Sequence, residues 1–190
     1  MIATRYMPAM RITVDTRKLT LAWAGCEDGP GENGLHEVGC RIGRGGVLPA
    51  TSKREGDGAT PRGIYPLRFG LWRADRLPPP RSRLVFHPIG ADDLWCDAPG
   101  HPAYNRWVKA PAASGFAASH ERLLREDMAY DLLLVIGHND SPPVPGRGSA
   151  IFLHLDRPDH RPTLGCVAVE PAAMIRLLRD VGPGWEVEIM

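Results

Sequence analysis

The chain has 190 residues, of which 43% are hydrophobic and 24% charged, a composition that suits one soluble folded domain. Its formal net charge of +1 gives no electrostatic reason to expect nucleic acid or an anionic membrane surface as a partner. The 21 glycines and 19 prolines favour a fold with many turns and short strands over a helical one.

Short runs of alternating or continuous apolar residues predict a succession of strands. The expected strands cover residues 10–25 (as a hairpin), 35–43, 64–73, 83–89, 129–139, 150–155, 166–169 and 185–190. Segments rich in glycine, proline or charge are expected to form the connecting loops. These are residues 29–34, 45–63, 75–82, 92–108, 140–149 and 156–165.

Two segments have the pattern of short helices. Residues 119–127 begin with Ser119, which can cap a helix, although a capping box is absent. Residues 171–181 have Pro171 in the first turn and Gly182 just past the end. Together with the strands, these segments predict a single domain over residues 1–190 with a mainly β fold, a sandwich or barrel with two short helices.

The four cysteines are widely spaced and form no metal-type pair. Cys26 and Cys40 could bridge two neighbouring strands, but four reduced thiols are the simpler reading, since no sequence rule decides the pairing. Cys166 stands out because Gly165 precedes it inside an otherwise strand-like stretch. A glycine within a strand marks a bulge, a close backbone approach or a special φ.

Polar residues at the ends of two apolar strands point to a reactive cysteine. His154 ends one strand, and residues 137–139 end the neighbouring one. An imidazole near a thiol activates it as a nucleophile, so we expect His154 to hold the pKa of Cys166 below the free value of about 8.5. Backbone N–H groups at Gly165 and Cys166 could stabilise an oxyanion. The alternative is a small, buried structural cysteine.

The stretch "IFLH" followed by a loop and "TLGCVAV" resembles the signature of the YkuD-type L,D-transpeptidase catalytic domain, in which a strand-terminal His precedes Ser/Thr-x-Gly-Cys. The segments "KREGDGATPRGIYPL", "LWCDAPGHPAYNRWV" and "GHNDSPPVPGRGSAIFLH" extend the resemblance upstream, as in one branch of that family. It covers residues 36–190, and the N-terminal hairpin fits it as well.

The resemblance implies a mechanism and a substrate. Cys166 would attack the carbonyl at the L-centre of a diaminopimelate in a peptidoglycan stem peptide and expel D-alanine, with His154 as general base oriented by a main-chain carbonyl near Leu155. The thioester would pass to an amine of another stem, forming a 3-3 or an L-alanine–diaminopimelate crosslink. The backbone of Gly165 and Cys166 would face the oxyanion. The resemblance implies no metal or organic cofactor, and a carbapenem-type β-lactam as a covalent inhibitor at Cys166.

The sequence departs from the family pattern beside the cysteine. Leu164 stands where many members have a second histidine, and Ala168 stands where many have Arg or Asn. These changes put the substrate contacts in doubt more than the chemistry. The candidates to replace the missing polar contacts, or to line a peptide groove, are His138, Asn139, Arg147, Thr163 and Trp95.

Other functions stay open at the level of sequence. Water as acceptor would make the protein an L,D-carboxypeptidase that trims tetrapeptides during recycling. A zinc site built from His138, Asp140, His154 and Asp156 would make it a metallopeptidase. A third alternative is an inactive peptidoglycan-binding module. A peptidoglycan substrate favours the periplasm or cell envelope, whereas the lack of a visible signal sequence or membrane span leaves the cytoplasm open. The sequence leaves the oligomeric state undetermined.

Overall fold

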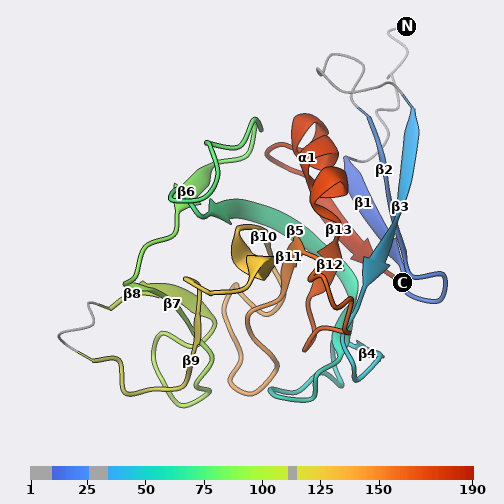
Figure 1. Cartoon of the computed structure of the whole chain (residues 1–190). Coiled ribbons are helices and arrows are strands. Elements are labelled where there is room, and N and C mark those ends of the chain that lie inside the picture. Colours follow the sequence, from blue (N-terminus) through green and yellow to red (C-terminus); the bar gives the residue numbers. More distant parts are fainter. Residues whose placement is uncertain (1–9, 26–33, 111–114) are drawn as a thin grey trace, which may run out of the picture.

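Most strands belong to one sheet that closes on itself, in the computed structural model that describes residues 10–25, 34–110 and 115–190 (Figure 1). Each strand pairs with the next in the ring, and β10 returns to pair with β5, so the sheet is a barrel. In ring order the strands are β5 (Thr60–Trp72), β10 (Leu132–Ile136), β11 (Phe152–Leu155), β12 (Val167–Val169), β3 (Leu35–Arg41), β2 (Thr20–Ala24), β1 (Arg11–Asp15) and β13 (Glu186–Ile189).

The two ends of the long strand β5 carry further short strands. β4 (Val47–Pro49) pairs in parallel with its first residues, and β6 (Phe86–Pro88) with its last. A second sheet stands beside the barrel, in the order β8 (Arg106–Lys109), β7 (Asp93–Cys96) and β9 (His120–Arg122).

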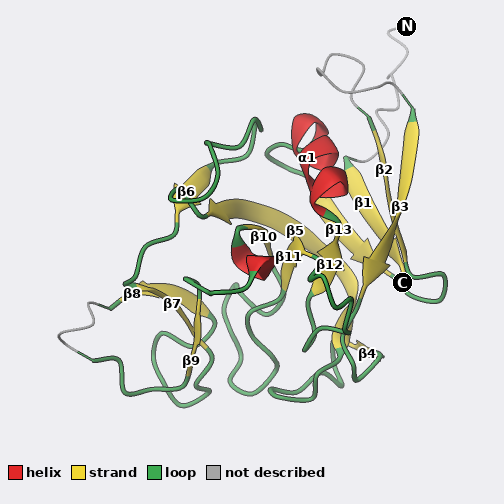
Figure 2. Cartoon of the chain, in the orientation of Figure 1, coloured by secondary structure: helices red, strands yellow, loops and turns green. Residues whose placement is uncertain are grey.

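The helix α1 (Pro171–Asp180) packs against the inside of the barrel. It begins at Pro171, which lacks an N–H but needs none, because the first N–H groups of a helix have no partner within the helix. Its apolar side is buried in the core cluster that also contains Trp23 of β2. Trp23 Nε1 donates to Asp180 Oδ2 at 2.8 Å, which ties the end of α1 to the barrel wall. Figure 2 shows how few helical segments stand among the strands and loops.

Alternation along β10 and β11 divides the core into two parts. Leu134 and Leu153 point into the barrel and join the cluster that α1 covers. Leu133 and Phe152 point to the other face and join a second cluster, which also contains Trp95 of β7. This outer face lies between the barrel and the second sheet, and it is the face on which Phe152 and His154 both project.

The mainly β fold expected from the sequence is confirmed, as are the strands on both sides of the cysteine and the helix that begins at Pro171. The helix expected over residues 119–127 is wrong. His120–Arg122 form β9, which pairs antiparallel with β7, and Leu123 is fully buried beneath it. Pairing with a strand from a distant segment outweighs the weak local helix signal. The second helical segment is instead the short 3-10 helix η1 (Met128–Tyr130).

Two segments expected to be loops also contain strands. Residues 92–108 contain β7 and most of β8, and residues 45–63 contain β4 and the start of β5. The three described cysteines are free and buried, whereas Cys26 and its possible bridge to Cys40 lie outside the described residues. Within the described ranges, no helix is long and apolar enough to span a membrane.

Candidate active site

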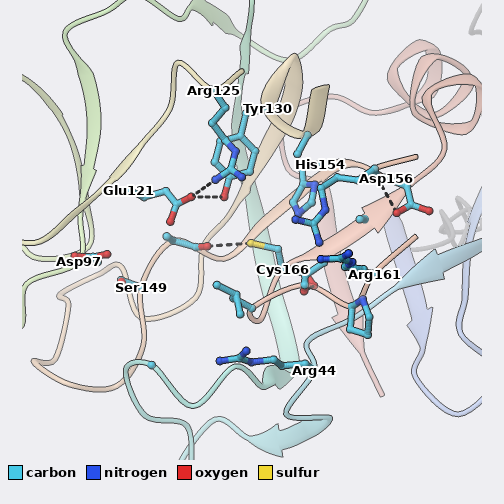
Figure 3. A pocket seen from close by; sticks show the side chains of 18 of the residues that line it. Arg44, Asp97, Glu121, Arg125, Tyr130, Ser149, His154, Asp156, Arg161 and Cys166 are labelled. Carbon is cyan, nitrogen blue, oxygen red and sulfur yellow. Dashed lines mark hydrogen bonds and ion pairs between the residues drawn. The ribbon is translucent and has the colours of Figure 1, made fainter. Parts of the chain in front are cut away.

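A cavity of about 540 Å³ opens on the outer face of β11 and β12, and both His154 and Cys166 line it (Figure 3). The two strands run in parallel with His154 opposite Ala168. Since alternate residues share a face, Cys166, two residues before Ala168, lies on the same side as His154. The imidazole and the thiol, predicted from the sequence to act together, therefore meet in one cavity.

The glycine before the cysteine is required by the backbone and by its neighbours. Gly165 has φ +134°, a conformation that L side chains rarely adopt. A Cβ there would lie 2.9 Å from the carbonyl oxygen of Ala59 and 3.3 Å from Ile151 Cδ1. The glycine thus lets the turn before Cys166 lie directly against the segment that leads into β5.

Thr163 holds this turn in place from the other side. Its Oγ1 accepts a hydrogen bond from the Gly165 N–H at 3.1 Å and donates to the Cys166 carbonyl at 2.6 Å. Its own N–H donates to the Ile42 carbonyl, and its carbonyl accepts from the Arg44 N–H, both at 2.9 Å. The cysteine is therefore presented from a turn that is anchored at both ends.

The thiol of Cys166 is buried and held by two main-chain groups. The Phe152 N–H donates to Sγ at 3.3 Å, and the thiol donates to the Ala150 carbonyl at 3.1 Å. Burial raises the pKa of Cys166 to about 12, although the hydrogen bond from the Phe152 N–H acts to lower it. The resting form at neutral pH is the thiol.

His154 is held in the orientation that the family resemblance implies. Its Nδ1 lies 2.8 Å from the Leu155 carbonyl oxygen, an acceptor, so the proton belongs on Nδ1 and Nε2 is left with a free lone pair. Burial lowers the pKa of His154 to about 4, and the Leu155 carbonyl raises it only in part. The edge of the Tyr130 ring packs against the imidazole with centroids 5.4 Å apart.

The expected low pKa of Cys166 is therefore wrong. Both groups are buried so deeply that desolvation disfavours the thiolate and the imidazolium together. The sequence places a histidine near a cysteine, but the sign of the pKa shift depends on how much water the fold leaves around them. The pair rests as neutral thiol and neutral imidazole.

A hydrogen-bonded group borders the cavity on the side of Tyr130. Glu121 accepts hydrogen bonds from the Tyr130 hydroxyl at 3.1 Å and from Arg125 Nη1 at 2.9 Å. The Arg125 guanidinium lies over the Tyr130 ring, 4.9 Å from its centroid, and also forms an ion pair with Asp127. This network fixes the ring that packs on His154.

Charged side chains of both signs border the cavity, with Arg125 beside Glu121 and Asp156 beside Arg161 (Figure 3). Arg44 and Arg161 lie on one side, close to the cysteine turn, while Asp97 and Glu121 lie on the other. Neither an ion pair nor a side-chain hydrogen bond of Arg44 is found within the described ranges. These four residues were not predicted as site residues, because each comes from a different segment and carries no local motif.

Of the five tentative contact residues, only Thr163 lines the cavity. His138 is buried with Nε2 bonded to the Arg147 carbonyl at 3.0 Å, and burial lowers its pKa. Asn139 fastens the following loop by bonding to the carbonyls of Val144 and Gly148.

The other two tentative residues also have structural partners. Arg147 donates to the carbonyl of Thr51. Trp95 is buried, donates from Nε1 to Asn105 Oδ1 at 2.9 Å and packs edge-on against Phe152. Trp95 therefore packs behind Phe152, the residue whose N–H contacts the Cys166 sulfur.

The residues of the alternative zinc site are not gathered. Asp140 forms an ion pair with Arg68 at 2.7 Å, and Asp156 accepts from His160 Nδ1 at the same distance. His154 Nδ1 already has the Leu155 carbonyl as partner. Among the residues described, no three His, Cys, Asp or Glu side chains are placed to hold a metal ion. His160 thus occupies the Asp156 carboxylate.

The structure thus has a closed barrel, an anchored Gly-Cys turn and a histidine on the adjacent strand, the features on which the sequence resembles the L,D-transpeptidase family. The L,D-transpeptidase catalytic domain family, YkuD, matches residues 9–189, nearly the whole chain, and the chain belongs to that family. No curated protein and no solved structure matches this chain.

Proposed function

We propose that the protein is a cysteine-dependent peptidoglycan L,D-transpeptidase with Cys166 as nucleophile and His154 as general base. The observation that carries this proposal is the placement of the thiol and a free imidazole nitrogen on one face of adjacent strands, in a cavity large enough for a peptide. The family supplies the class of substrate, the stem peptides of peptidoglycan. That substrate favours the periplasm or cell envelope as the place of action.

In the first half-reaction, the thiol proton passes to His154 Nε2 as Sγ attacks the donor carbonyl. A C–S bond forms, the C–N bond to D-alanine breaks, and the imidazolium returns its proton to the leaving amine. Because both groups rest neutral, the proton transfer accompanies the attack on the carbonyl and does not precede it as a separate thiolate-forming step. The Leu155 carbonyl stabilises the imidazolium through Nδ1.

The oxyanion that forms during this attack needs N–H donors. The Gly165 amide already donates to Thr163 Oγ1, so it would have to give up that hydrogen bond to bind the oxyanion. The Cys166 amide is the remaining candidate of the pair, and Thr163 holds it in position through the Cys166 carbonyl. We therefore assign the oxyanion contact to Cys166 first and to Gly165 second.

Arg44 and Arg161 are the candidates for donor recognition. Stem peptides carry several carboxylates, and a guanidinium binds a carboxylate through two parallel hydrogen bonds. Both arginines border the cavity near Leu164 and Ala168, the positions where the sequence lacks the polar residues of its family. They can supply the positive charge that position 168 does not.

The second half-reaction decides between two activities. An amine that attacks the thioester gives a crosslink, whereas water gives the L,D-carboxypeptidase product. We favour transfer to an amine because only 7% of Cys166 is exposed in the free protein, so water would have little access to a thioester formed there. The inactive binding module is the third alternative, and the intact His154–Cys166 pair speaks against it.

Incubation with disaccharide-tetrapeptide, followed by mass spectrometry, tests this proposal. A dimer that has lost one D-alanine supports transpeptidation, and fragmentation locates the new bond. Tripeptide alone identifies the carboxypeptidase. If neither product forms from tetrapeptide or pentapeptide, and Cys166→Ala behaves like the parent, the proposal is refuted.

A further inference from the structure

Two oxygen atoms on the side of the cavity where Asp97 and Glu121 lie are buried without partners within the described residues. Asp97 Oδ1 and Ser149 Oγ have no hydrogen-bond partner within the described part of the chain, although both residues line the cavity. Ser149 is 7% exposed, so it is more than nine-tenths buried. Buried polar atoms in folded proteins nearly always have a partner, so two together at a cavity indicate that a ligand supplies it.

The chemistry of these atoms indicates what kind of ligand. A carboxylate is an acceptor only, and a serine hydroxyl accepts as readily as it donates. Asp97 has no ion pair within the described ranges, and the nearby Glu121 adds negative charge that Arg125 offsets in part. A primary ammonium group, with three N–H donors and a positive charge, complements this arrangement.

The position of the pair relative to the thiol indicates which substrate the ligand belongs to. Ser149 directly precedes Ala150, whose carbonyl accepts the Cys166 thiol proton at 3.1 Å. In Figure 3, Asp97 and Ser149 lie across Cys166 from Arg161, the arginine assigned above to the donor. A group bound here reaches the thioester from the side opposite the donor carboxylates.

We propose that Asp97 and Ser149 form the subsite for the primary amine of the acceptor stem peptide. This inference rests on the proposed transpeptidase activity and adds the residues that select an amine over water. The acceptor enters as an ammonium ion and loses one proton to His154. Its nitrogen then forms the C–N bond while the C–S bond breaks, the second proton goes to sulfur to restore the thiol, and His154 releases its proton to solvent.

A labelled-donor assay tests this subsite. Isotope-labelled disaccharide-tetrapeptide is the donor and unlabelled disaccharide-tripeptide is the acceptor, so crosslinked dimer and hydrolysed tripeptide are distinguished by mass. Loss of one charged hydrogen bond in Asp97→Asn should lower the ratio of crosslinked to hydrolysed product roughly tenfold or more. Ser149→Ala should lower it less, because the lost hydrogen bond involves a neutral group. Asp92→Asn, an acidic position outside the cavity, is the matched control and should keep the parent ratio.

A binding titration provides a second readout. On a Cys166→Ala background, disaccharide-tripeptide should bind more weakly after Asp97→Asn, and after Ser149→Ala if the asparagine variant does not fold. The same peptide with its amine acetylated should bind equally with and without these changes.

The two proposals fail in different ways. If the thioester forms in Asp97→Asn and the ratio of crosslinked to hydrolysed product is unchanged, the amine subsite is refuted and the transpeptidase proposal is not. Absence of any thioester in the parent overturns the transpeptidase instead, and equal affinity for free and acetylated tripeptide then overturns the amine subsite as well.

Discussion

Alkylation of Cys166 by iodoacetamide should be slow and should not depend on His154. The thiol and the imidazole are both buried and neutral at pH 7, so no preformed thiolate–imidazolium pair speeds the reaction. Acylation by substrate or a carbapenem should differ, since in the proposed mechanism the histidine takes the thiol proton during the attack. His154→Gln should therefore separate the two reactions.

The magnitude follows from the pKa of Cys166, which is about 12. At pH 7 the thiolate fraction is roughly 3,000-fold below that of a free cysteine with a pKa of about 8.5. The more basic thiolate is a better nucleophile, with a Brønsted coefficient of about 0.4–0.5, which recovers roughly 30-fold. The expected rate of alkylation is roughly 100-fold below that of a free thiol. Burial of the sulfur slows it further.

The assay measures alkylation of Cys166 by peptide mass mapping between pH 6 and 9, with glutathione as reference. The parent rate should rise steadily with pH and show no plateau. Alkylation of His154→Gln should stay within about threefold of the parent rate, while acylation falls by about 10²–10⁴. A plateau below pH 8, or a tenfold loss of alkylation in His154→Gln, would show that a stable ion pair exists and that the reasoning from burial is wrong.

Three further predictions concern the same turn and its histidine. Gly165→Ala should lower the free energy of unfolding by about 1–3 kcal/mol in a denaturant titration, because φ is +134° and the new Cβ would meet the Ala59 carbonyl. An unchanged denaturation midpoint would show that alanine is not strained at this position. Thr163→Val should lower the free energy of unfolding by about 1–3 kcal/mol and slow thioester formation. The Gly165 N–H loses its acceptor and the Cys166 carbonyl loses its donor. A normal rate of acylation would show that the turn keeps its shape without these two hydrogen bonds. The pKa of His154 is about 4 in the folded protein and about 6.5 unfolded, so its contribution to stability is present above pH 6.5 and is lost as the pH falls towards 4, by on the order of 3 kcal/mol. His154→Gln should lack this part of the acid sensitivity, and identical pH dependence in parent and variant would refute the lowered pKa.

The sequence alone was sufficient for features that depend on near neighbours in the chain. The apolar run over residues 150–155 predicts a buried strand that ends near His154, and the structure has this strand as β11. Gly165 before Cys166 predicts a bulge, a close backbone approach or a special φ, and the structure has both the positive φ and the close approach to Ala59. The segment that begins at Pro171 has the helix it predicts. In each case the physical cause lies within a few residues.

Tertiary structure decided the features whose causes lie far apart in the chain. Residues 120–122 of the expected helix pair as a strand because β7 lies beside them, which no local propensity reveals. Arg44 and Asp97 border the same cavity only because the barrel closes and the second sheet packs beside it. The same closure removes water from Cys166, and desolvation then raises the pKa that a nearby histidine was expected to lower. Solvent exposure is set by every segment that packs around a group, so the sequence could name the proposed nucleophile and its proposed base but could not give their charge states.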